Sequence, residues 1–174
     1  TKKIKLLLLI LGLSFILVGC GARVQQTLTI ESEFKGSRTA EVHVDNETLG
    51  HINGGEEALT AVLDTNKPEA LEMTVTPDEN DDGVYYEFKY DFDSLDNYIE
   101  KTKSIIGSEF TATFETQQNE ENPFAKTVVY EETNIKSQIL QWAIDAVAAS
   151  GITSESPSNF IESNNLTSTF DTYE

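Results

Sequence analysis

The chain has 174 residues, of which 30 are Asp or Glu and 12 are Lys or Arg, and its formal net charge is −18. This length fits one domain, or one domain with a tail. The hydrophobic content of 39% is enough to build a core, which excludes an intrinsically disordered acidic chain. A single cysteine excludes a disulfide framework and a multi-cysteine metal site. The acidic excess argues against a nucleic-acid partner, because phosphate binding needs clustered basic residues.

Residues 1–19 have the pattern of a secretory signal peptide. Three lysines precede an apolar run from Leu6 to Val18 that is shorter than the ~20 residues a membrane-spanning helix needs. The run ends in Leu17-Val18-Gly19-Cys20, which resembles the lipobox of bacterial lipoproteins. The resemblance implies that a diacylglyceryl group is attached to the thiol of Cys20 and that the chain is cut just before it. The alternative is an uncleaved signal anchor that ends in an ordinary cysteine.

A lipidated Cys20 would hold the protein at the cell membrane, facing outside the cytoplasm, because two acyl chains are sufficient for stable anchoring. Cleavage would remove the three lysines of the signal and leave 9 basic residues against 30 acidic ones, a charge of −21. Anionic headgroups repel such a body. We therefore expect residues 20–25 to act as a short tether, with the acyl chains as the main contact with lipid.

The body of the chain alternates between strand and helix patterns. Apolar residues at every second position predict a hairpin over 27–34 and 40–44 with a turn at 35–38, and a second hairpin over 71–75 and 84–92. A third strand pair is expected at 110–114 and 126–132. Helical spacing of apolar residues predicts helices at 56–63, 95–106 and 135–149. Asp93 or Ser94 is expected to cap the second of these, and Gly107 to end it.

This order predicts an α+β fold: one antiparallel sheet of about six strands in ββα-ββα-ββα order, with the helices packed on one face. The globular domain should span residues 26–151. In residues 152–174, 12 of the 23 residues are Ser, Thr or Asn, which is typical of a surface tail or linker. Apolar residues in this segment, among them Phe160 and Phe170, leave open an extra strand or the start of a further domain.

The heptapeptide Phe92-Asp93-Ser94-Leu95-Asp96-Asn97-Tyr98 follows an aromatic strand. Together with the lipobox and the early hairpin, it resembles the LppM-type family of bacterial envelope lipoproteins. The resemblance implies an α+β body exposed outside the membrane, with no established catalytic set.

The loop at 78–83 fits the first half of a calcium loop, in which Asp78, Asn80 and Asp82 would supply oxygen ligands. Lys89 stands at the twelfth position, where a bidentate Glu is needed, and the loop connects strands instead of helices. The alternative interpretation is a solvated acidic hairpin loop. Apart from this candidate Ca²⁺ loop, no cofactor is expected.

The other residues that could bind a ligand or take part in catalysis are predicted to have structural roles. His43 falls on the outward face of its strand beside two carboxylates, and His51 lies in a loop with no partner signal. The aromatic residues of 84–92 favour core packing, with an apolar ligand groove as the alternative. Trp142 is predicted to be part of the core or an exposed contact residue. The sequence has no G-x-S-x-G, H-E-x-x-H or glycine-rich phosphate motif.

These observations predict a non-enzymatic, lipid-anchored binding or accessory protein of the bacterial cell envelope. Its partners would be basic or neutral envelope proteins, or wall polymers bridged by cations. One alternative is a carrier of a lipid or other apolar ligand between sheet and helices, with a pocket lined by Phe88, Tyr90 and Ile99. The other is an envelope glycan hydrolase, which would need two carboxylates facing each other across a cleft.

Overall fold

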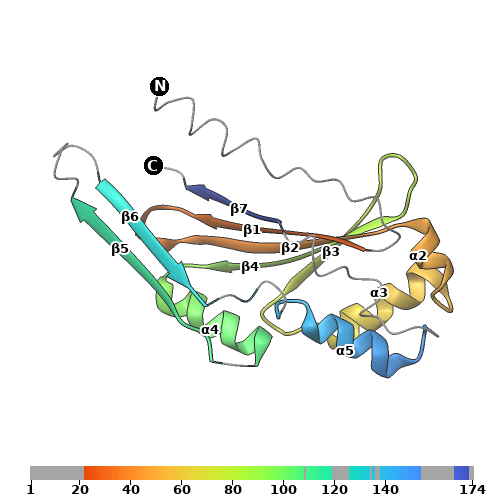
Figure 1. Ribbon diagram of the computed structural model, residues 1–174. Helices are drawn as coiled ribbons and strands as arrows, with labels where there is room; N and C mark the ends of the chain where they lie inside the picture. The colour runs from red at the N-terminus through yellow and green to blue at the C-terminus, as the bar shows by residue number, and fades with distance from the viewer. Residues whose placement is uncertain are drawn as a thin grey trace.

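The structure, a computed structural model, describes residues 22–107, 109–118, 126–133, 135, 138–153 and 167–172. The predicted signal peptide and the lipobox residues Leu17, Val18, Gly19 and Cys20 therefore lie outside the described residues. The elements in chain order are β1 (Arg23–Ile30), a 3₁₀ turn (Ser32–Phe34), β2 (Gly36–Val44), α2 (Asn46–Gly50), α3 (Gly55–Asn66), β3 (Glu72–Pro77), β4 (Val84–Phe92), α4 (Leu95–Ile106), β5 (Ala112–Gln118), β6 (Lys126–Glu132), α5 (Gln141–Ser150) and β7 (Thr167–Thr172) (Figure 1).

The fold is α+β, as predicted, but its strands form two sheets and not one. Five strands pair in the order β3-β4-β2-β1-β7, and β5 pairs with β6 in a separate antiparallel hairpin. All pairs in the larger sheet are antiparallel except β1 with β7, which is parallel. The expectation of a single six-stranded sheet was wrong because, among the described residues, β5 and β6 pair only with each other, while β5 also contacts α4.

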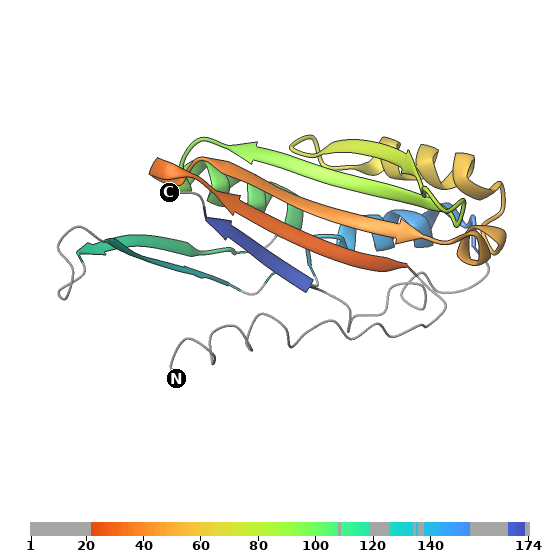
Figure 2. The same ribbon diagram turned by 90° about the horizontal axis from the view of Figure 1, so that it is seen from above.

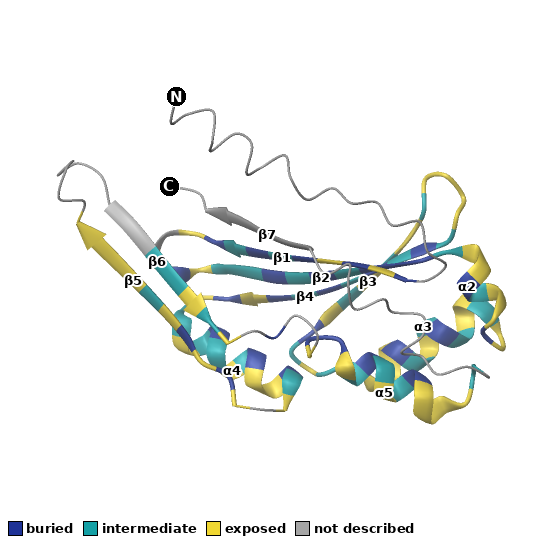
Figure 3. Cartoon of the chain, in the orientation of Figure 1, coloured by how far each residue is buried: buried dark blue, intermediate teal, exposed yellow. Residues whose placement is uncertain are grey.

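Helices α3, α4 and α5 lie on the same side of the five-stranded sheet (Figures 1 and 2). The alternate residues of β4 point toward them, and Val84, Tyr86, Phe88, Tyr90 and Phe92 are all buried, as their period of two predicts. The buried positions along the strands and along the inward faces of the helices form one continuous core (Figure 3).

The first strand begins earlier than the alternation from Thr27 suggested. Ala22 is buried, Val24 and Gln26 continue the inward positions of Leu28 and Ile30, and β1 starts at Arg23. Residues 22–25 of the expected tether are therefore part of the folded body, since β1 pairs with β2 from its first residue. At its other end Phe34 is buried, but it leaves the strand in a 3₁₀ turn with positive φ at Glu33 and Phe34.

Capping and helix-breaking residues account for several of the helix ends. The Ser94 hydroxyl accepts a hydrogen bond from the Asn97 backbone N–H at 3.2 Å, and α4 ends at Gly107 with φ +65°. Helix α3 continues past residue 63 to Asn66, two residues before Pro68. Helix α5 begins at Gln141 and not near Ile135, because Leu140 has non-helical backbone angles.

The serine-rich segment contributes an extra strand. Within it, residues 167–172 form β7, which extends the sheet beside β1, and a bridge joins Ile52 to Thr153. Among the residues that the structure describes, no helix has the length and apolar character needed to cross a membrane.

Candidate functional site

An apolar cavity of about 80 Å³ lies between the inner face of the sheet and helices α3 and α5. The sheet contributes side chains from β2 and β4, including Val42, Val44 and Phe88. The helices contribute Leu59 and Leu63 from α3, and Ala143, Ile144 and Val147 from α5, with Leu140 just before it. Ala22, which directly precedes β1, completes one part of the wall, together with Thr48 and Ile52 near α2.

The composition of α5 explains why space remains there. Four of its ten residues are alanines, and one of them, Ala143, is buried and lines the cavity. Interiors are close-packed, so a small residue between two helices and a sheet leaves a gap unless a neighbour fills it. Trp142 lies beside the gap and packs edge-on against Phe88, with the ring centroids 5.1 Å apart. The prediction that Trp142 belongs to the core is therefore correct, although its side chain stays partly exposed.

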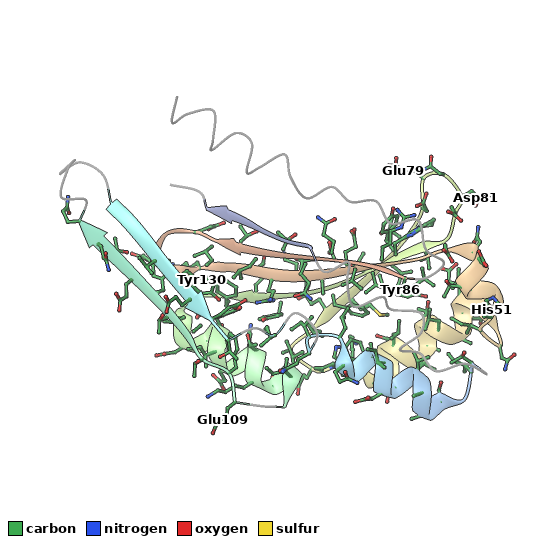
Figure 4. All side chains as sticks on the ribbon, in the orientation of Figure 1. His51, Glu79, Asp81, Tyr86, Glu109 and Tyr130 are labelled. Atoms are coloured by element: carbon green, nitrogen blue, oxygen red, sulfur yellow. The ribbon has the colours of Figure 1, made fainter. Side chains whose placement is uncertain are left out.

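The wall of the cavity is almost entirely hydrocarbon. Tyr86 is fully buried and points from β4 toward α3 (Figure 4), where its hydroxyl lies 2.9 Å from the hydroxyl oxygen of Thr60. Burial raises the pKa of the Tyr86 phenol. The hydroxyl is thus neutral and already hydrogen-bonded, and the ring presents carbon to the cavity. Such a site suits an apolar ligand and offers nothing to a charged one.

The predicted pocket residues are only partly right. Phe88 lines the cavity, whereas Tyr90 and Ile99 do not. Tyr90 lies further along β4, where its ring is near-parallel to that of Tyr98 at 6.2 Å and its hydroxyl is 2.8 Å from that of Thr102. Helix α4 packs against that end of the sheet, whereas the cavity lies against α3 and α5.

A buried polar cluster, which we name the Arg38 cluster, joins the sheet, α4 and the β5–β6 hairpin. Arg38 donates to both carboxylate oxygens of Glu132 at 3.0 Å and to the hydroxyl of Tyr98 at 2.6 Å. It also donates to the side-chain oxygen of Gln26 at 3.1 Å. The hydroxyls of Tyr98 and Tyr130 both donate to Glu132, each at 2.5 Å.

The charges of the Arg38 cluster balance within the protein. Burial lowers the pKa of Arg38, but the Glu132 carboxylate at 3.0 Å opposes this effect and the net pKa is raised, so the guanidinium stays charged. Burial raises the pKa of both Tyr98 and Tyr130, which therefore remain hydrogen-bond donors. Since the Arg38 side chain is only 4% exposed, we interpret the cluster as a structural connection and not as a binding site.

Sequence reasoning missed the Arg38 cluster because it placed Arg38 in a turn. The alternation of the strands contained the signal that was missed. Arg38 lies an even number of residues from Ala40, Val42 and Val44, so it shares their face of β2, and Gln26 shares the face of Leu28 in β1. Both polar residues are therefore on the inward face, where a polar group needs a partner. The partner, Glu132, is 94 residues away in the chain.

His43 lies on the outer face of the sheet, as predicted, but it is buried and not solvated. Its ring centroid is 4.5 Å from that of Tyr85, and its Nε2 is 3.1 Å from a carboxylate oxygen of Asp78. The Asp78 carboxylate also accepts the backbone N–H of Asn80 at 2.6 Å, and this hydrogen bond is the main reason that the pKa of Asp78 is lowered. The acidic loop therefore covers His43.

The structure places the three predicted calcium ligands in different surroundings. Asp78 is directed toward His43 and Asn80, whereas Asn80 and Asp82 are exposed. Among the described residues, no three or more His, Cys, Asp or Glu side chains are grouped so as to hold a metal ion. His51, the other histidine, is exposed in the turn after α2 (Figure 4).

Comparison with known proteins adds no assignment: no protein-family model, no curated protein and no solved structure matches this chain. The resemblance to LppM-type lipoproteins therefore stays a prediction.

Proposed function

We propose that the protein is a lipid-anchored binding protein of the bacterial envelope whose folded body takes up an apolar chain. The observation that supports this binding role is the cavity between the sheet and helices α3 and α5. It favours the carrier alternative over a purely surface-binding accessory protein. The anchor rests on the lipobox at Leu17 to Cys20.

The size of the cavity restricts the ligand. An engineered apolar cavity of ~150 Å³ stays dry and binds benzene, and this one has about half that volume. It therefore accommodates a short stretch of hydrocarbon, such as part of one acyl chain, with the remainder of the ligand outside. Typical ligand pockets of roughly 300–1,000 Å³ enclose most of a small molecule, so a complete lipid is not expected to be enclosed.

The binding role can be tested with a fluorescent polyene fatty acid on the full chain in mild detergent. Trp142 is the only tryptophan and packs against Phe88 of the cavity wall, so energy transfer from Trp142 reports occupancy. Ala143→Phe should fill the cavity and weaken binding at least ten-fold. Ala148→Phe, on the exposed side of the same helix, is the matched control and should bind normally. Equal binding by the two variants would exclude the cavity as the site.

The predicted anchor has a separate test. Cells that express the chain are fed an alkyne-labelled fatty acid, and the mature N-terminal peptide is analysed by mass spectrometry. We expect a diacylglyceryl group on Cys20 and no label on a Cys20→Ser variant. An unmodified cysteine inside an uncleaved signal segment would contradict the predicted location.

An accessory role with a basic or neutral envelope partner is the second candidate. The exposed acidic side chains of α3 favour it, because Glu56, Glu57 and Asp64 lie along one groove beside Met73. All three carboxylates come from one helix, so they do not face each other across a cleft as the hydrolase alternative requires. A crosslinked pull-down from native membranes tests the accessory role. A partner held by charge should be lost as salt rises, whereas binding that strengthens with salt would contradict it.

A further inference from the structure

The cavity lies next to the predicted site of lipid attachment. Ala22 is 6% exposed, lines the cavity, and is only two residues after Cys20 in the chain. Two residues of backbone span at most about 7 Å, whatever their conformation. An acyl chain attached to the Cys20 thiol therefore begins within reach of the cavity wall.

The early start of β1 shortens the tether that was expected between the folded body and the predicted anchor. Because Arg23 already pairs with His43 of β2, the body begins within two or three residues of the lipidated position. The start of β1 lies at the same end of the sheet as α2 (Figure 1), and Ala22, which directly precedes β1, lines the cavity. A ligand attached to the same chain has an effective concentration in the millimolar range, far above that of a free lipid monomer in water.

The chemistry and size of the cavity match such an occupant. Its wall is hydrocarbon, and a volume of about 80 Å³ holds part of a chain, not a complete ligand. An acyl chain that is covalently attached to the protein needs no polar contacts and no full enclosure in the cavity, since its attachment already provides specificity. A partly open apolar cavity beside the membrane surface would otherwise expose its wall to water.

We infer that one acyl chain of the lipid on Cys20 occupies the cavity in the resting protein, while the other stays in the membrane. This inference rests on the proposed apolar-chain binding and on the predicted lipidation of Cys20. It gives the site a form of regulation: a free lipid chain must displace the protein's own chain. Displacement would return the second chain to the bilayer and strengthen the anchor.

The test uses the full chain in native membranes of cells fed a fatty acid with a diazirine near its terminus. After irradiation, the crosslinked peptides are identified by mass spectrometry. We expect crosslinks from the Cys20 lipid to the peptide that contains Ala143, Ile144 and Val147. The Ala143→Phe variant should reduce them at least five-fold, and Ala148→Phe should leave them unchanged. Crosslinks from the Cys20 lipid to membrane lipids alone would overturn the inference.

A second measurement separates this inference from the proposed binding role. The Cys20→Ser full chain lacks the competing acyl chain, so it should bind the fluorescent fatty acid at least ten-fold more tightly than the lipidated protein. Equal affinity of the two proteins would refute self-occupancy and leave the binding role intact. If neither protein binds the probe but the intramolecular crosslinks form, the cavity serves only the anchor. An unmodified Cys20 would overturn the inference directly.

Discussion

Removing the carboxylate of Glu132 leaves the buried guanidinium of Arg38 without its counter-ion, and Glu132→Ala should be strongly destabilising. The Arg38 side chain is 4% exposed and that of Glu132 is 14% exposed, so water cannot replace the lost partner fully. Arg38 would keep its hydrogen bonds to Tyr98 and Gln26, which are neutral. A charge that stays buried after its partner is removed costs much more than the pair contributes.

The size of the effect follows from this geometry. Breaking a buried ion pair on one side costs about 3–5 kcal/mol, against a total stability of about 5–15 kcal/mol for a domain. With a urea m value of about 2 kcal/mol/M, a loss of about 4 kcal/mol lowers the midpoint of unfolding by about 2 M. Replacing the pair with Arg38→Met and Glu132→Leu together should restore most of this loss, because the two apolar side chains need no partner.

Urea unfolding followed by the fluorescence of Trp142 measures the free energy of unfolding for each variant. The matched control is Asp64→Ala, which removes an exposed ion pair with Lys67 of 2.8 Å and should cost less than about 1 kcal/mol. The reasoning fails if Glu132→Ala costs no more than this control. It also fails if the double variant is as unstable as the single one, since the loss would then not come from the unpaired charge.

Three further predictions concern glycine, capping and pH. Gly83→Ala should lower stability by about 1–3 kcal/mol, because φ is +106° and a Cβ would meet the Val44 carbonyl oxygen at 2.0 Å; Gly107→Ala, with positive φ but open space, should cost less in the same urea assay. Ser94→Ala removes the cap of α4 and should cost about 1 kcal/mol in thermal unfolding, whereas no loss would refute the cap. Burial raises the pKa of Tyr90 to about 12, so its stabilising contribution is complete below pH 10 and is lost as the pH rises toward 12. An ultraviolet absorbance titration should show that Tyr90 ionises at a higher pH than an exposed tyrosine, and ionisation of all six tyrosines near pH 10 would contradict this prediction.

Calcium provides a separate check on the acidic loop. Because Asp78 contacts His43 and Asn80, the Asp82→Asn variant and the unchanged protein should show the same melting temperature with calcium as with a chelator. A calcium-dependent rise that disappears in the variant would instead support the predicted site. The measurement is differential scanning fluorimetry of both proteins.

Local patterns predicted most of the secondary structure. The period of two in β4 and the cap and glycine that bound α4 depend on neighbouring residues, so the sequence contains all the information they need. The fold class followed from the order of these elements. Helix α5 was predicted six residues too early because Ile135 and Ile139 keep the helical spacing of buried residues without being helical.

The candidate site could be predicted only in part. Phe88 was predicted to be a core residue, and it is buried. The carrier alternative also placed it in a pocket, and Phe88 does line a cavity, which lies against α3 and α5 beside Ala143. Tyr90 keeps the same alternation as Phe88 in the sequence, yet Tyr98 and Thr102 of α4 pack against it. Packing between elements that are distant in the chain decides which apolar face is filled, and no local pattern records it.

Composition and short-range spacing are sufficient to predict the α+β class, the inward face of β4, the bounds of α4 and the acidic character of the body. The division into two sheets, the pairing of Arg38 with Glu132 and the position of the cavity beside Ala22 depend on how distant elements pack. Arg38 and Glu132 are 94 residues apart in the chain, and the cavity wall includes Ala22 and Val147, which are 125 residues apart. The stability of these features comes from burial and charge neutralisation in three dimensions, which spacing along the chain does not specify.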